Sequence, residues 1–245
     1  MKIEVLFPEI CNLYGDLFNV KYLSDCMPEA EVVNTGLKDE PLFVKEEPDL
    51  IYMGTTTERG QQLVIEALTP YKERIKECIN KGVCFFVTGN AMEVFGKTIS
   101  EEGVKVCDGL GILDIDSDRN RRARYNSLYL GEFKDESLEE PIKIAGFKSL
   151  FGFSIGNNSE NFFLNTLRGD GLNLKVKEEG FRINNFFATH VTGPFLVLNP
   201  PFTKWLMRNI MGAESAELAF EEAAMDAYNS RIKEYSDPST GIQYE

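Results

Sequence analysis

The residues of greatest chemical interest lie where a buried strand turns sharply into a short helix. The run Val83–Thr88 is β-branched and aromatic, Gly89–Asn90 interrupts it, and an apolar-periodic stretch starts at Ala91. In many α/β enzymes such a turn holds a nucleophile in a strained backbone geometry, and the helix N-terminus behind it stabilises negative charge. Here the residue at the turn is glycine, which has no side chain with which to attack a substrate.

The chain offers few other groups for nucleophilic or acid–base catalysis. It has one histidine, His190, and five dispersed cysteines without a Cys-x-x-Cys pair. The single histidine excludes mechanisms that need two histidines in one chain. The odd number of cysteines argues against a disulfide framework or a zinc site and favours a reduced, cytoplasmic setting. Cys84 is expected to be a buried core thiol, whereas Cys11, in a loop near the strand ends, is an alternative nucleophile.

Alternating strands and helices must position the turn. A helical pattern runs from Leu63 to Ile79, and Gly82 is expected to cap it. Strands are expected at Lys2–Phe7, Glu31–Asn34, Asp49–Met53 and Val83–Thr88. This alternation favours a parallel, doubly wound sheet, in which ligands bind at the carboxyl ends of the strands. The loops after Met53 and Thr88 would both lie there.

Beyond Lys97 the pattern changes to short apolar runs, with no long helix until about Thr203. We expect these runs to be strands of the same domain that add to the sheet in antiparallel orientation. Helices are expected at Thr203–Met211 and Ala213–Tyr235. The predicted organisation is a domain over residues 1–212, a helical extension over residues 213–235 and a frayed tail over residues 236–245.

The composition excludes several classes of function. The 245 residues carry a net charge of -13, which argues against binding to nucleic acid or to an anionic membrane surface. No apolar run approaches the roughly 20 residues that a membrane span needs, and the N-terminus has no signal-peptide pattern. Neither a P-loop nor a Gly-x-Gly-x-x-Gly motif is present. We therefore expect no cofactor and no membrane span.

Four stretches of the sequence together resemble one protein family. They are LYGD at Leu13–Asp16, GTTTERGQ at Gly54–Gln61, GLGILD at Gly109–Asp114 and THVTGPFLVLNP at Thr189–Pro200. In order and spacing they are similar to the class I glutamine amidotransferase-like family of the CobB/CobQ type, with its GatD-like branch nearest. The resemblance implies an α/β, three-layer flavodoxin-like fold with a mostly parallel sheet and antiparallel additions. It also implies release of ammonia from glutamine in complex with a Mur ligase-like subunit or another amide ligase.

The catalytic positions that the resemblance implies are not filled. The family's nucleophilic cysteine corresponds to Gly89 and its catalytic histidine to Thr192, while His190 lies two residues too early. Its Gly-Phe-Glu-Asn-His motif corresponds to Gly146–Leu150, again without histidine. The family reaction needs a thiolate nucleophile and an imidazole that moves the proton, and neither glycine nor threonine can supply these. Glycine at position 89 would also relieve a backbone strain of about 1–3 kcal/mol.

Other parts of the implied binding site are present. In the loop after the third strand, Gly54, Arg59 and Gln61 match the family, while Thr55 and Thr56 replace glycines. Arg124 matches loosely an arginine that the family uses for the substrate carboxylate. The residues that we predict to line a ligand-binding cleft are Thr55, Thr56, Arg59, Gln61, Asn90, Arg124 and His190.

Several of these residues have a simpler structural interpretation. The basic cluster of this acidic chain consists of Arg119, Arg121, Arg122 and Arg124. It is either a solvated loop with ion pairs or a carboxylate contact at the mouth of the cleft. Thr55 and Thr56 fit a plain turn equally well. We expect His190 to be a hydrogen-bonded structural residue, and Glu93, at a glutamine of the family motif, to face solvent.

The sequence therefore predicts a catalytically degenerate amidotransferase-like protein that serves as a binding or scaffolding partner of an amide ligase, Mur ligase-like or related to cobyric acid synthase. The alternative is an active amidotransferase or amidohydrolase with a relocated nucleophile, such as Cys11 or a threonine. A third hypothesis is a small-molecule sensor that uses the vacated pocket.

Overall fold

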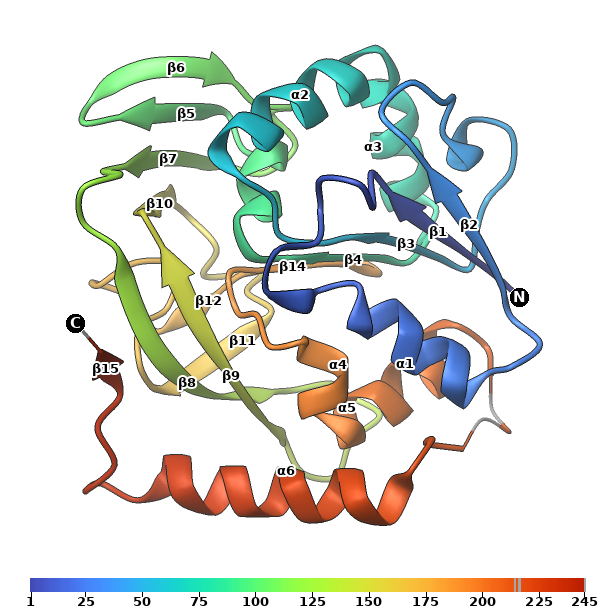
Figure 1. Cartoon of the computed structure of the whole chain (residues 1–245), viewed down its shortest axis with the longest axis vertical. Coiled ribbons are helices and arrows are strands. Elements are labelled where there is room, and N and C mark those ends of the chain that lie inside the picture. The colour runs from blue at the N-terminus through green and yellow to red at the C-terminus, as the bar shows by residue number, and fades with distance from the viewer. Residues whose placement is uncertain (214, 216, 245) are drawn as a thin grey trace.

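The computed structural model describes residues 1–213, 215 and 217–244, and Figure 1 shows a central sheet with helices on both faces. The sheet has six strands in the order β13–β14–β4–β3–β1–β2. These are β1 (Lys2–Leu6), β2 (Glu31–Thr35), β3 (Leu50–Met53), β4 (Phe85–Thr88), β13 (Phe181–Ile183) and β14 (Phe186–Thr189). All neighbours are parallel except β13 and β14. The predicted mostly parallel sheet with an antiparallel addition is confirmed.

Helices α2 (Glu58–Leu68) and α3 (Lys72–Asn80) cover one face of this sheet. Thr57 caps α2, because its hydroxyl accepts a hydrogen bond from the amide of Gly60 at 3.0 Å. The predicted continuous helix is divided, since a 3₁₀ turn at Thr69–Tyr71 contains Pro70, which has no amide hydrogen for an α-helical bond. Gly82 follows α3 with a left-handed φ of +82°, as expected of the residue after a helix.

The opposite face carries α1 (Phe18–Cys26), α4 (Phe195–Leu198) and α5 (Pro200–Trp205). The chain thus has two apolar cores, one on each side of the sheet. The strands between them are apolar on both faces, and for this reason β3 and β4 are buried along their whole length. The second core is rich in aromatic rings, which include Phe86, Phe133, Phe163, Phe187, Phe202 and Trp205.

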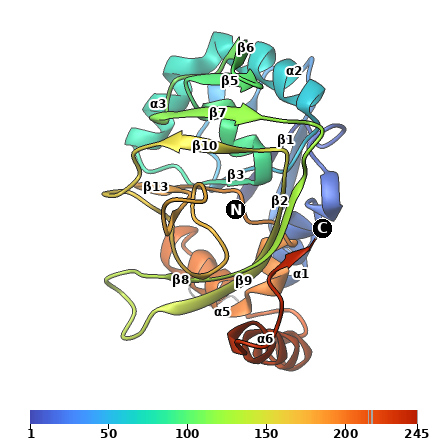
Figure 2. The same cartoon turned by 90° about the vertical axis from the view of Figure 1, so that its left-hand side faces the viewer.

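Most of the short strands in the second half form two further sheets. One has the order β10–β7–β5–β6 and the other β12–β11–β8–β15, with β9 on the second edge of β8. Figure 2 shows β8 and β9 running from the sheet that contains β7 and β10 toward α6. Their bounds are β5 (Thr98–Glu101), β6 (Val104–Asp108), β7 (Ile115–Arg119), β8 (Tyr125–Phe133), β9 (Ile142–Leu150), β10 (Gly152–Gly156), β11 (Leu164–Arg168), β12 (Glu178–Glu179) and β15 (Gln243–Tyr244).

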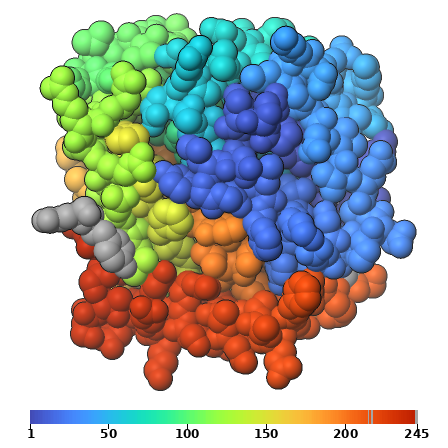
Figure 3. Space-filling model, viewed as in Figure 1, coloured from blue at the N-terminus to red at the C-terminus, as the bar shows by residue number. Residues whose placement is uncertain are grey.

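The last long helix, α6, spans Glu221–Ser236 and lies along one side of the molecule (Figure 3). It begins later than residue 213, where the sequence placed it, because Phe220 adopts a left-handed φ of 54° that no α-helix accommodates. Glu214 and Ala216, which belonged to the predicted helix, lie outside the described residues. The helix packs against β8, β9, α4 and α5, and the domain boundary at residue 212 stays a prediction.

The tail was expected to fray, and this was wrong for its described part. Residues Gln243–Tyr244 pair with β8, and the Arg168 guanidinium donates to the backbone carbonyls of Tyr235, Asp237 and Thr240 at 2.6 to 2.7 Å. These bonds fix the chain between α6 and β15. Among the described residues, no helix is long and apolar enough to cross a membrane.

Candidate functional site

The turn after β4 keeps the geometry of a nucleophile elbow. Gly89 is buried, has a φ of +61° and starts a 3₁₀ helix at Gly89–Phe95. A β-carbon built at this position would lie 2.1 Å from the hydroxyl oxygen of Thr55. Any side chain at residue 89 would therefore meet both a disfavoured backbone conformation and an occupied space.

The Thr55 side chain fills this space and is held there by the buried carboxylate of Asp16. Asp16 Oδ2 accepts hydrogen bonds from the amide and the hydroxyl of Thr55, at 2.8 and 2.7 Å, and from the hydroxyl of Thr88 at 2.7 Å. Asn19 and Tyr52 complete what we call the elbow cluster: Asp16, Asn19, Tyr52, Thr55 and Thr88. Burial raises the pKa of Asp16 above its ordinary value, although the hydrogen bonds oppose this shift.

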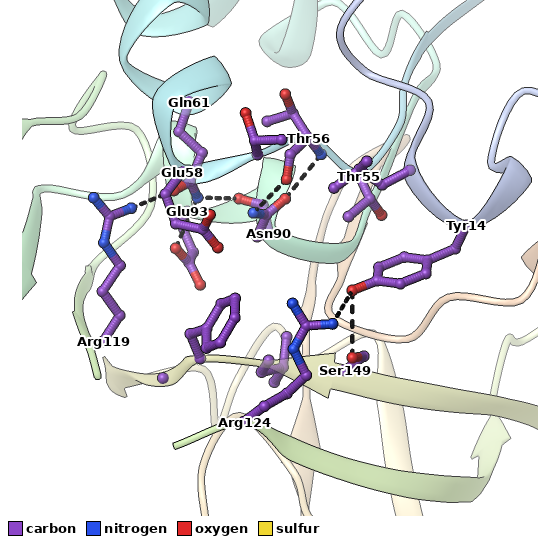
Figure 4. Close-up of a pocket in the computed structure, with 15 residues that line it drawn as sticks. Tyr14, Thr55, Thr56, Glu58, Gln61, Asn90, Glu93, Arg119, Arg124 and Ser149 are labelled. Atoms are coloured by element: carbon purple, nitrogen blue, oxygen red, sulfur yellow. Dashed lines mark hydrogen bonds between the residues drawn. The ribbon is translucent and has the colours of Figure 1, made fainter. Parts of the chain in front are cut away.

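A cavity of about 120 Å³ lies beside the elbow, and Figure 4 shows its wall. Of the predicted cleft residues, it is lined by Thr55, Thr56, Gln61, Asn90 and Arg124. Arg59 is exposed on α2 and is not part of the wall, and neither is His190, which is completely buried. Thr57 and Arg119, which the sequence suggested as possible pocket residues, also line it, and the lining residues that the sequence analysis missed are Leu13, Tyr14, Glu58, Glu93, Ser149, Leu150, Phe151 and Gly152.

Amide side chains join the two loops at this end of the sheet. Asn90 Oδ1 accepts from the amide of Thr56 at 3.0 Å, and Asn90 Nδ2 donates to the Thr56 carbonyl at 2.8 Å. Gln61 Nε2 donates to the Asn90 carbonyl and to Glu93 Oε2, at 2.7 and 2.8 Å. The Arg119 guanidinium donates to Gln61 Oε1 at 2.9 Å. The cavity wall is thus held by its own hydrogen bonds.

Glu93 was expected to face solvent, and this was wrong. Its exposed fraction is 7%, and it lines the cavity with one carboxylate oxygen bonded to Gln61. The other oxygen lies 3.6 Å from His190 Nε2. The pattern of this short helix could not show which face would be covered, because the covering residues, Gln61 and His190, come from α2 and from the segment after β14. Its position at the glutamine of the family motif was the available signal.

His190 is the structural residue that we expected. Its backbone amide donates to Glu179 Oε1 at 2.8 Å, and its Nε2 lies 3.4 Å from the Ser154 hydroxyl. Its Nδ1 has no hydrogen-bond partner among the described residues. Thr192, at the position of the family histidine, is 2% exposed and donates to the carbonyl of Phe147 at 3.2 Å.

The lysine in the Gly146–Leu150 stretch forms a buried ion pair. Lys148 Nζ bonds to Glu179 Oε2 and donates to the carbonyls of Asp170 and Gly171, at 2.8 and 2.7 Å. Glu179 Oε1 also accepts from the hydroxyl of Thr189 at 2.9 Å. Burial opposes the negative charge of Glu179, but Lys148 and His190 outweigh it and lower the pKa of this carboxyl. We call Lys148, Glu179, Thr189 and His190 the ionic cluster.

The arginines of the predicted basic cluster lie in different environments and have different partners. Arg121 is exposed and pairs with Glu101 at 2.7 Å, as in the simpler interpretation. Arg124 lies 4.3 Å above the ring of Phe151 and donates to the Tyr14 hydroxyl at 3.3 Å. Arg119 is 8% exposed, and its Nε lies 3.5 Å from Glu101. Arg119 and Arg124 therefore bring two positive charges to the cavity.

Cys11 does not have the environment of a relocated nucleophile. The side chain is fully buried, and burial raises the pKa of its thiol to about 12, which leaves almost no thiolate at neutral pH. Cys84 is a core thiol, as expected. Among the described residues, no group of three or more histidine, cysteine, aspartate or glutamate side chains has a geometry that could hold a metal ion.

Comparisons with known proteins place these features in a family. Residues 2–200 match the model of the CobB/CobQ-like glutamine amidotransferase domain. Over 224 residues the chain is 26% identical to the GatD subunit of lipid II isoglutaminyl synthase (glutamine-hydrolyzing) from Staphylococcus aureus (strain N315), with 88% of this chain and 85% of the relative covered.

Two solved structures from Thermotoga maritima have a similar fold. PurLQS has a TM-score of 0.53 at 12% identity, covering 94% of this chain and 97% of that chain. A glutamine amidotransferase has a TM-score of 0.51 at 11% identity, covering 95% and 94%. At these identities the likeness concerns the fold alone, and it confirms the predicted amidotransferase-type α/β architecture.

Proposed function

Because this chain belongs to the CobB/CobQ-like glutamine amidotransferase family, we propose that it is a member without the hydrolytic pair and acts as a binding or scaffolding partner of an amide ligase. Hydrolysis of glutamine in this family type needs a thiolate and a base. The residues at the two corresponding positions are Gly89 and Thr192, which offer neither group.

The observation that carries this proposal is the filled space above Gly89. Thr55 takes the volume that a cysteine side chain would need, and Asp16 holds it there with two hydrogen bonds. Replacement of the nucleophile by glycine alone would leave a cavity next to residue 89, whereas here the Thr55 side chain occupies that volume. The elbow cluster therefore supports a stable, non-hydrolytic protein, because more than the nucleophile itself has changed.

Within the described part of the chain, no other pair of groups supports glutamine hydrolysis as the alternative function. The thiol of Cys11 is buried with a pKa of about 12, and no described cysteine lines the cavity. The imidazole of His190 faces Ser154 and Glu93 and not a thiol. The threonine hydroxyls at the elbow are already hydrogen-bonded, those of Thr55 and Thr88 to a carboxylate.

The proposed partner is a Mur ligase-like subunit or an amide ligase related to cobyric acid synthase. Support comes from the relative in Staphylococcus aureus, which is a subunit of a synthase. We also propose a cytoplasmic location, supported by five cysteines that are all free. For the domain organisation, we propose that residues 1–212 form the amidotransferase-like domain and that the C-terminal segment docks on it through α6.

The test is a glutaminase assay on the purified chain, alone and mixed with a co-expressed Mur-type ligase. We expect no ammonia release above that of buffer, and we expect association with the ligase in size-exclusion chromatography. A glutamine-hydrolysing amidotransferase serves as the positive control. Ammonia release that disappears in the Cys11→Ala variant would overturn the proposal and establish the relocated nucleophile.

A further inference from the structure

The cavity beside the elbow carries both signs of charge on its wall. Glu58 and Glu93 line it together with Arg119 and Arg124, and Figure 4 shows the two carboxylates between the two guanidinium groups. The formal charges of these four side chains cancel. A ligand that carries both a positive and a negative group can meet an opposite charge at each end, whereas a ligand with one charge cannot.

Glu93 provides an acceptor-only group with unused capacity. A carboxylate offers about four lone-pair positions and no donor, and Gln61 donates to only one of its two oxygens. The second oxygen is 3.6 Å from His190 Nε2, too far for a good hydrogen bond. Since a carboxylate that is 7% exposed is costly without a cation, the position favours an ammonium group in the cavity.

Glu58 supplies the second carboxylate of this end. It is the first residue of α2 and is partly exposed, and no described residue donates a hydrogen bond to its side chain. Two carboxylates from α2 and from the 3₁₀ helix after β4 therefore face one side of the cavity.

Arg124 lies across the cavity from Glu58 and Glu93 (Figure 4) and has donors that lack good acceptors. Arg119 is less available, because it donates to Gln61 Oε1 at 2.9 Å and its Nε lies 3.5 Å from Glu101 Oε2. Arg124 precedes β8, and its hydrogen bond to the Tyr14 hydroxyl is long, at 3.3 Å. Its planar group has five N–H donors, which suit a carboxylate.

We propose that the cavity binds a small ω-amino acid, with its ammonium group at Glu58 and Glu93 and its carboxylate at Arg124. Arg124 lies across the cavity from the two carboxylates (Figure 4), which favours a ligand whose charged groups are separated by a short chain over one that carries both on a single carbon. The volume of about 120 Å³ limits the ligand to a few heavy atoms. This inference rests on the proposed function, because a site without a nucleophile holds its ligand unchanged.

The test uses the full chain and γ-aminobutyrate as the probe, with calorimetry and a thermal-shift assay. Butyrate lacks the ammonium, butylamine lacks the carboxylate, and glutamine carries both charges on one carbon. We expect γ-aminobutyrate to bind more tightly than all three and to raise the melting temperature. Glu93→Gln should weaken its binding by about tenfold or more, because a charge-assisted hydrogen bond is lost.

Glu58→Gln is the second variant, which keeps the test decisive if Glu93→Gln does not fold, and it should also weaken γ-aminobutyrate. The matched control is Glu140→Gln, an exposed residue outside the cavity, which should bind like the unmodified chain. Equal binding of butyrate, tighter binding of glutamine, absence of saturation, or unchanged affinity in the variants would each overturn the inference. Ammonia release from glutamine would instead overturn the proposed function, whichever ligand binds.

Discussion

Two polar clusters are buried at the carboxyl ends of the central strands, and they differ in how a carboxylate is kept inside the protein. In the elbow cluster, hydroxyl and amide groups surround Asp16, and no cation contacts it. In the ionic cluster, Glu179 meets the ammonium of Lys148 directly. The pKa shifts follow this difference, since that of Asp16 is raised by burial and that of Glu179 is lowered despite burial.

Of the two carboxyl groups, that of Asp16 is the more readily protonated in the folded protein. Neutral donors compensate only part of the desolvation of Asp16, so protonation of its carboxyl in the folded protein is comparatively easy. The Lys148 ammonium compensates more, but only as long as both members of the pair are present. We therefore expect the ionic cluster to be most sensitive to loss of its cation, and the elbow cluster to be sensitive to steric change and to loss of its hydroxyl donors.

The largest effect should come from Lys148→Met, which removes the cation and leaves Glu179 buried without an ion-pair partner. Breaking a buried pair in this way costs about 3–5 kcal/mol of unfolding free energy. The measurement is urea denaturation at neutral pH. The double variant Lys148→Met/Glu179→Leu should recover much of the loss, because both charges are then absent. A single variant within about 1 kcal/mol of the unmodified chain would contradict the comparison.

The next largest effect is expected at the elbow, from Gly89→Ala. The left-handed φ of +61° and the contact with the Thr55 hydroxyl should together cost about 2–4 kcal/mol. The control is Gly103→Ala, where φ is +78° but a β-carbon would meet nothing within 4 Å, so only the backbone strain of about 1–2 kcal/mol applies. Adding Thr55→Gly to Gly89→Ala should recover the steric part.

If Gly89→Ala cost no more than Gly103→Ala, the space above the elbow would not be filled in solution. That result would remove the observation on which the proposed function rests. Urea denaturation of the three variants and the unmodified chain under one set of conditions gives the comparison directly.

The local parts of this fold could be predicted from the sequence. The buried strands β1, β3 and β4 are apolar runs that end at turn residues, and a sheet covered on both faces requires that pattern. The elbow was visible for the same reason, because Gly89 follows such a run directly. Family membership, which rested on motifs in order, is confirmed by the match over residues 2–200.

The parts that could not be predicted depend on contacts between distant residues. Glu93 is buried because Gln61 and His190 approach it from other elements, and nothing within its own helix indicates this. Arg119 continues the alternation that buries every second residue of β7, whereas Arg121, two residues later, lies beyond the end of the strand and is exposed. The tail is fixed by Arg168, whose role no local pattern predicts.

An intermediate effect should appear in the dependence of stability on pH. The folded-state pKa of Glu179 is lowered from 4.5, so its contribution is present above the unfolded pKa and is lost as the pH falls through the folded value. The folded-state pKa of Asp16 is raised from 3.8, so its contribution is present at low pH and is lost as the pH rises through the folded value. The two carboxylates therefore give slopes of opposite sign.

The measurement is the unfolding free energy between about pH 3 and 7. In Glu179→Gln the loss of stability on acidification should be shallower than in the unmodified chain, and in Asp16→Asn it should be steeper, because the opposing slope has been removed. Slopes that change in the same direction in both variants would contradict the opposite pKa shifts of Asp16 and Glu179.

The smallest effects should come from removing one hydroxyl in each cluster. Thr88 donates to Asp16 at 2.7 Å, and Thr189 donates to Glu179 at 2.9 Å. Each Thr→Val change keeps the shape of the side chain and removes a hydrogen bond to a carboxylate. We expect Thr88→Val to cost about 1.5–3 kcal/mol and Thr189→Val about 1 kcal/mol, because Glu179 keeps its ammonium partner while Asp16 has only neutral donors. Both costs are read from urea denaturation, and the reverse order would show that the ammonium of Lys148 does not compensate Glu179 more fully than hydroxyl groups compensate Asp16.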